Sequence, residues 1–204
     1  MVARVAILRT TAMPFLLKFT DIRSYLFATT FVLLSIGLPF TFHQFHLAGP
    51  TYLPMHIFVL LAGLLFGWRA GLVVGFFSPI ISYAISGMPV PAVLPQIVAE
   101  LSVYGLVGGL LREKAHLHVP WSLLGAMISG RIFLLLVTSM LFLVTGEANS
   151  PLGAESTPLT VLWSAVKQGW PGIVIQLAAL PILVWLIERF AARDRGLRNE
   201  QRGV

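Results

Sequence analysis

One carboxylate interrupts an otherwise apolar segment, residues 87–109 (GMPVPAVLPQIVAELSVYGLVGG): the side chain of Glu100. An unpaired carboxylate is costly in hydrocarbon, so we expect it to face the interior of a helix bundle and to be paired or protonated there. Gln96 and Tyr104 lie four residues before and after it, and a helix places residues at this spacing on one face. The pattern predicts a polar stripe within a membrane.

The expected partner of Glu100 is Arg131, which lies about midway along a later apolar segment, residues 121–145. A helical rise of about 1.5 Å per residue puts Arg131 roughly 9 Å deeper than Glu100, and a long arginine side chain can cross such a gap. The pair has two interpretations, a tie between helices or a ligand-binding site. Intramembrane charges generally mark functional sites, which favours the second.

Three histidines, His43, His46 and His56, cluster around one connection between apolar segments. Imidazoles suggest a metal site or an axial ligand. No carboxylate accompanies them at a ligand-like spacing, however, so we predict no metal and no cofactor. Hydrogen bonding to a ligand and simple placement at the membrane interface remain as alternatives.

The last apolar segment begins near Lys167, Gln168 and Trp170, and Pro171 and Pro181 interrupt its helical pattern. A cation and an aromatic ring at this position can hold an anionic ligand. Lys and Trp also serve as anchors at membrane interfaces. The sequence leaves both interpretations open.

These residues must be positioned by membrane helices. The 204-residue chain is 57% hydrophobic and only 11% charged, and its apolar runs lack the strict alternation of a membrane β-barrel. We therefore predict an all-α membrane protein built as a bundle of six transmembrane helices. The predicted spans are residues 22–43, 54–67, 69–86, 92–111, 121–145 and 160–188, of which the second is short for a full crossing.

Basic residues predict the orientation of the bundle. They cluster before the first span, between spans two and three, between spans four and five, and after span six. Because Lys and Arg favour the cytoplasmic side, both termini are expected there, which requires an even number of spans. We treat residues 1–204 as a single membrane domain, with a basic segment at 1–21 that shows no cleavage site and a basic tail at 189–204. The net charge of +6 indicates contact with anionic lipid rather than nucleic acid.

Small residues four apart predict close packing of the helices. Examples are Gly63 with Gly67, Gly71 with Gly75, and Gly105 with Gly109. The connections on the opposite side, residues 44–54, 87–93 and 146–160, are rich in Pro, Gly and small polar residues. We expect them to close over a bound ligand, although Pro and Gly also simply end helices.

Several activities have no support in the sequence. It contains no GxxxxGKS/T phosphate-binding loop, no GxGxxG, no HExxH and no GxSxG. Uphill transport would therefore need an ion gradient or a separate ATPase, and the lack of evident inverted repeats disfavours an autonomous secondary transporter. An intramembrane enzyme that uses Glu100 and His56 as acid and base, or a scaffold protein, are the alternatives to a ligand-binding protein.

Residues 54–112 carry a family resemblance. Its most specific parts are the PMH of residues 54–56, which starts the segment and contains His56, the Gly-rich turn around Trp68, the GMP of residues 87–89 and the ELSVYG run of residues 100–105. In this order they resemble the substrate-binding S components of energy-coupling-factor (ECF) vitamin transporters, particularly the branch with pantothenate and cobalamin S components.

The resemblance implies a non-enzymatic subunit of the cell (plasma or inner) membrane that binds one vitamin or vitamin precursor in a pocket open to the outside. It implies partners as well: a membrane-embedded coupling subunit and two cytoplasmic ATPases, unless the protein is a solitary S component. The family's pocket, formed by outer loops and the outer halves of later helices, maps here onto His56, Met88, Gln96, Glu100 and Tyr104. The depth argument adds Arg131, Lys167 and Trp170.

One motif departs from the family pattern. Many S components contact the coupling subunit through AxxxA on the first helix, whereas this chain has Ser24, Ala28 and Val32 at the nearest equivalent positions. A rearranged contact is expected if the protein uses a coupling subunit.

Overall fold

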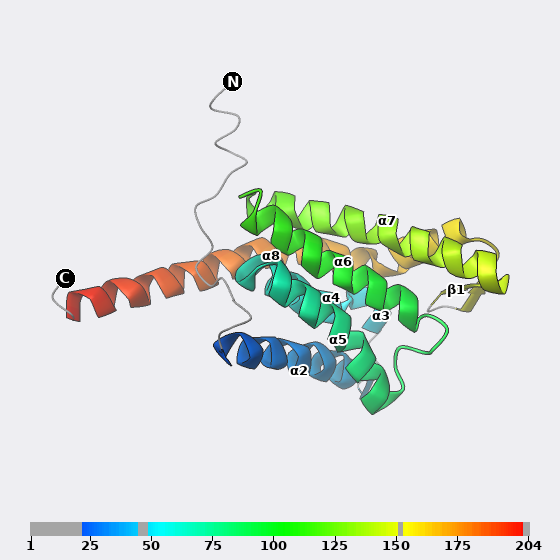
Figure 1. Cartoon of the computed structure of the whole chain (residues 1–204), viewed down its shortest axis with the longest axis horizontal. Helices are drawn as coiled ribbons and strands as arrows, with labels where there is room; N and C mark the ends of the chain where they lie inside the picture. The colour runs from blue at the N-terminus through cyan, green and yellow to red at the C-terminus, as the bar shows by residue number, and fades with distance from the viewer. Residues whose placement is uncertain (1–21, 45–48, 151–152, 202–204) are drawn as a thin grey trace, which may run out of the picture.

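The computed structural model describes residues 22–44, 49–150 and 153–201 of the chain, and these residues are predominantly helical. Figure 1 shows the helices packed side by side, with a small hairpin at one end of the bundle and the last helix running beyond the other end. The elements in chain order are α2 (Ile22–Gln44), α3 (Gly49–Tyr52), α4 (Pro54–Phe66), α5 (Trp68–Ser86), α6 (Leu94–Glu113), α7 (Val119–Thr145), β1 (Ala148–Ser150), β2 (Gly153–Glu155) and α8 (Pro158–Gln201).

The first five predicted spans each coincide with a helix to within a few residues, whereas the last, residues 160–188, lies within α8, which continues to Gln201. Among the described residues, four segments are long and apolar enough to cross a membrane: α5, α6, α7 and the 158–190 part of α8. The apolar helix α4 has 13 residues, about 20 Å at the usual helical rise, and the apolar part of α2 spans Ala28–Gly37. Six full crossings and the cytoplasmic position of both termini therefore stay predictions.

Proline and glycine set the helix boundaries as the sequence suggests. Prolines occupy the first turns of α4, α6 and α7, where the missing N–H costs nothing. Gly87 and Gly146 end α5 and α7 in the left-handed conformation, which glycine adopts without steric penalty. The predicted interruption of the last segment does not occur, because α8 continues through both Pro171 and Pro181.

Glycines allow the backbones of α4, α5 and α6 to contact one another directly. A Cβ atom added to Gly63 would lie 2.6 Å from the carbonyl oxygen of Gly105, and one added to Gly71 would overlap the Gly105 backbone. Around these contacts lie fully buried aliphatic side chains, among them Leu64, Val74 and Leu101. The predicted close packing is confirmed for these three helices, and it fixes α6, which carries Glu100.

Replacing Gly105 with alanine is expected to destabilise the protein by about 1–3 kcal/mol, because the new methyl group has to push two backbones apart. Gly37 is a matched control, since a Cβ there meets no heavy atom within 4 Å. Thermal unfolding in detergent should show a lower midpoint for Gly105→Ala and no loss for Gly37→Ala. Equal midpoints for the two variants would contradict this view of the packing.

The connection between α7 and α8 contains a hairpin that the sequence did not predict. Its strands pair antiparallel, with Ala148 opposite Glu155. The Ser164 hydroxyl donates to Oε1 of Glu155 at 2.6 Å, which attaches the hairpin to the start of α8. The 44–54 connection contains the short helix α3, and residues 87–92 are largely exposed. Closure of these segments over a ligand stays a prediction.

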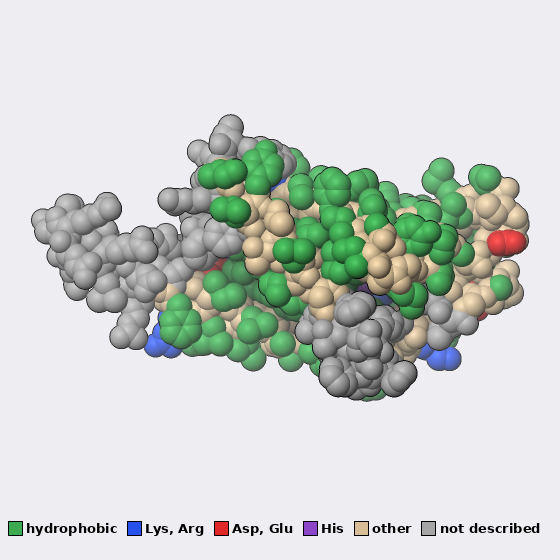
Figure 2. Space-filling view, turned by 90° about the horizontal axis from the view of Figure 1, so that it is seen from below, with side chains coloured by type: hydrophobic (Ala, Val, Ile, Leu, Met, Phe, Trp, Pro, Cys, Tyr) green, Lys and Arg blue, Asp and Glu red, His purple; other side chains and the backbone are tan. Residues whose placement is uncertain are grey.

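The outer surface of the bundle is largely apolar. Figure 2 shows hydrophobic side chains along the middle of one face, with Lys, Arg, Asp and Glu nearer to its ends. Large exposed hydrophobic residues include Leu26, Leu136, Leu143, Val144 and Trp185. A surface of this kind is suited to lipid and would be a liability in water.

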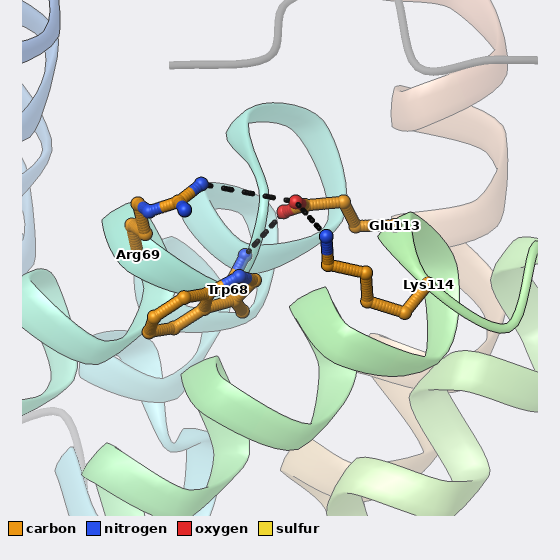
Figure 3. A network of polar contacts seen from close by, with 4 residues as sticks. All are labelled: Trp68, Arg69, Glu113 and Lys114. Carbon is orange, nitrogen blue, oxygen red and sulfur yellow. Dashed lines mark hydrogen bonds and ion pairs between the residues drawn. The ribbon is translucent and has the colours of Figure 1, made fainter. Parts of the chain in front are cut away.

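Charged residues make contacts at the end of the bundle remote from the hairpin, where α5 begins and α6 ends (Figure 1). Figure 3 shows the contacts around Glu113. The Glu113 carboxylate accepts from the backbone N–H of Trp68 at 3.4 Å and lies 3.9 Å from Arg69 and 3.7 Å from Lys114. A carboxylate at the first residue of α5 complements the helix dipole. Arg112, which the predicted span of residues 92–111 leaves in the following connection, lies in the last turn of α6, where it is buried and paired with Glu188 of α8. These contacts join α5, α6 and α8 at this end.

Replacing Glu113 with glutamine is expected to cost about 1 kcal/mol, because the charge at the N-terminus of α5 is lost while the side-chain shape is kept. Lys114→Gln is the control, since its side chain is 66% exposed and exposed ion pairs contribute little. The measurement is the unfolding midpoint in detergent at low salt. A larger loss for Lys114→Gln than for Glu113→Gln would refute this assignment.

Candidate functional site

The site is built around an ion pair between α6 and α7. Nη1 of Arg131 lies 2.9 Å from Oε1 of Glu100, so the predicted pairing is observed. Glu100 is 5% exposed as a residue and the Arg131 side chain is 15% exposed. The two atoms are in contact but are not aligned as a hydrogen bond. The pair places opposite charges side by side in the interior of the bundle, and the acid does not point into lipid.

Two further residues of α6 complete the polar stripe. Gln96 and Tyr104 are both buried, as the spacing of four residues on either side of Glu100 predicts. Tyr104 lies close enough to the carboxylate to hydrogen-bond with it. Its ring packs directly on Gly130 of α7, where an added Cβ would overlap the ring carbons. Gly130 therefore makes room for the aromatic side chain beside Arg131.

His56 reaches the same cluster from α4. Its ring contacts Tyr104 edge-on, with centroids 5.3 Å apart and planes at 62°. It also lies within electrostatic range of Arg131. Three helices thus contribute to one buried polar group, which we call the polar cluster: His56, Gln96, Glu100, Tyr104 and Arg131.

The polar cluster retains unused hydrogen-bonding atoms. Nδ1 and Nε2 of His56, and Nε and Nη2 of Arg131, are buried and have no hydrogen-bond partner among the described residues. Buried polar groups in proteins are normally satisfied, so such atoms require an explanation. The Nε–Nη2 edge of Arg131 can donate to two neighbouring acceptor atoms, while Nη1 contacts Glu100.

The other predicted site residues are placed differently. Met88 and Lys167 are exposed, and Trp170 is 61% exposed, whereas the polar cluster is buried. Their part in ligand binding stays a prediction. His46 lies outside the described residues, as does the side chain of His43. The described part of the chain contains no group of His, Asp or Glu side chains suited to a metal ion.

The sequence reasoning missed Gln176 of α8. This side chain is 1% exposed, and its amide donates to the carbonyl of Leu53 at 3.3 Å. Leu53 adopts a left-handed conformation just before α4 begins, so the bond holds the turn that positions His56. The sequence feature that indicates Gln176 is the same as for Glu100: a single polar residue within an apolar run, here GIVIQLAAL.

Two of the three α2 residues compared with AxxxA, Ala28 and Val32, face inward, and the side chain of Ser24 lies outside the described part. Val32 is buried and Ala28 packs against the same core. This face is therefore occupied by the bundle itself. Leu26 and Leu33, on another face of α2, are exposed.

Fold and site together define a multi-pass helical membrane protein with a buried, charge-paired polar cluster between helices. The family model described as "ECF transporter, substrate-specific component" matches residues 11–184, and the chain belongs to this family. No match was found among curated proteins or among solved structures.

Membership carries general consequences. Proteins of this family are substrate-binding components of transporters and in general not enzymes. They associate with an ECF module and bind a small-molecule substrate. The resemblance found in residues 54–112 is thereby confirmed at the level of the family, but not at the level of the pantothenate and cobalamin branch.

Proposed function

We propose that this protein is the high-affinity binding subunit for uptake of a vitamin or vitamin precursor, of the pantothenate or cobalamin type, across the cell (plasma or inner) membrane. It crosses the membrane six times with both termini in the cytoplasm. A coupling subunit and two cytoplasmic ATPases supply the work. The observation that carries the proposal is the buried polar cluster, whose unused donors lie between helices of an ECF substrate-specific component.

The polar cluster is better explained by a ligand than by helix association alone. A pair that only joins helices needs its own hydrogen bonds satisfied, because unpaired buried donors cost free energy. Here Arg131 leaves one full edge without a partner, and His56 leaves both ring nitrogens without one. A ligand that enters from the hairpin side would satisfy these atoms in a site from which water is excluded, which strengthens each contact.

The proposal is tested by thermal-shift screening and titration of the purified protein with a panel of vitamins. A ligand present at about 100 times its Kd should stabilise the protein by about 2.7 kcal/mol. Arg189→Met is the control for the site, because Arg189 is exposed and contacts only the ring of Trp185 among its described interactions; it should keep the ligand response. If no vitamin in the panel stabilises either protein, the proposed function is wrong.

A further inference from the structure

The charge balance of the polar cluster restricts what can bind there. Glu100 and Arg131 neutralise each other. The described residues that interact electrostatically with this pair are Tyr104 and His56, whose side chains carry no charge in their neutral forms. A ligand carboxylate at the free edge of Arg131 would bring a second negative charge beside Glu100. The buried group would then carry a net negative charge, which is strongly disfavoured away from water.

His56 adds an independent restriction. A neutral imidazole offers one N–H donor and one acceptor nitrogen, and neither ring nitrogen has a partner among the described residues. A carboxylate only accepts, so it leaves the acceptor nitrogen of His56 unsatisfied. An amide, or a ring lactam with adjacent C=O and N–H groups, supplies both an acceptor and a donor.

Arg131 fits the same chemistry. The Nε–Nη2 edge of an arginine donates to two neighbouring acceptors in one plane, and the carbonyl oxygen of a heterocycle beside an unprotonated ring nitrogen is as suitable a pair as the two oxygens of a carboxylate. Bidentate recognition therefore does not require an anionic ligand. The carboxylate of Glu100 holds the guanidinium in place through Nη1, which leaves Nε and Nη2 of Arg131 available to a ligand.

Resting on the proposed function, we infer that the ligand group held by Arg131 and His56 is neutral and planar, an amide or a heterocyclic carbonyl edge, and that no carboxylate of the ligand binds at Arg131. If the ligand has a carboxylate, it lies outside the polar cluster.

The test compares matched acid and neutral probes on the wild-type protein: pantothenate with pantothenol, biotin with biotin amide, and nicotinate with nicotinamide. Thiamine, riboflavin and cobalamin complete the panel. For any pair that binds, loss of the carboxylate should change the Kd by less than about tenfold. Binding only of riboflavin or cobalamin, which need no carboxylate, also supports the inference. A loss of about 100-fold or more on removal of the carboxylate, or binding of thiamine alone, overturns it while leaving vitamin binding intact.

A charge-neutral double variant, Glu100→Gln with Arg131→Gln, gives a second readout. It should weaken the acid and the neutral member of a binding pair by the same factor, within about threefold. A loss at least about tenfold greater for the acid would place the carboxylate at Arg131 and contradict the inference. If no probe of the panel binds the wild-type protein, the proposed function itself fails, and the inference fails with it.

Discussion

Replacing Arg131 with methionine is expected to destabilise the protein by about 3–5 kcal/mol, because the carboxylate of Glu100 is left buried without its partner. Methionine keeps much of the side-chain volume, so the effect reports on the charge rather than on a cavity. The measurement is the thermal unfolding midpoint in detergent, with the exposed Arg189→Met as control. A midpoint for Arg131→Met equal to that of the control would mean that the ion pair does not form.

The double variant Glu100→Met with Arg131→Met tests whether the unpaired carboxylate of Glu100 or the loss of the arginine side chain itself causes the destabilisation. Replacing both partners of a buried ion pair with apolar residues is often neutral or stabilising, so the double variant should recover most of the lost stability. Recovery identifies the unpaired charge as the cause of the defect. A double variant that is less stable than Arg131→Met alone would contradict this explanation.

Concentrative uptake is expected to disappear completely when the protein is expressed without a functional ECF module. The chain has no nucleotide-binding motif, and a protein that does no work on the solute cannot accumulate it against a gradient. Uptake of a labelled ligand should be measured in cells with intact ATPases and in matched cells with an inactive ATPase Walker lysine. Equal accumulation in both would show that the protein works as a solitary transporter.

The helices and the central ion pair were predictable from sequence for physical reasons. Membrane spans are defined by the length of apolar runs, which is a property of the chain in one dimension. A charge inside such a run must find a partner, and few candidates exist. The pairing of Glu100 with Arg131 is therefore predictable from sequence, and the burial of Gln96 and Tyr104 on the same face follows from helical periodicity.

Features that depend on how distant segments meet were not predictable. The burial of Arg112 requires α8 to bring Glu188 beside α6, and the contact of His56 with Tyr104 depends on the crossing of α4 and α6. The paired strands β1 and β2 are too short and too rich in small residues to show alternation of apolar and polar side chains. The inward face of α2 at Val32 likewise depends on tertiary packing.

The central claim is that the polar cluster binds the transported ligand. The most direct measurement is isothermal titration of the Glu100→Met, Arg131→Met double variant with the vitamin that the wild-type protein binds, after its unfolding midpoint has shown that the fold is retained. We predict an affinity at least about 100-fold weaker than that of the wild type, the equivalent of two or more lost hydrogen bonds to a charged group. An affinity equal to that of the wild type would contradict the claim and limit the pair to a structural role.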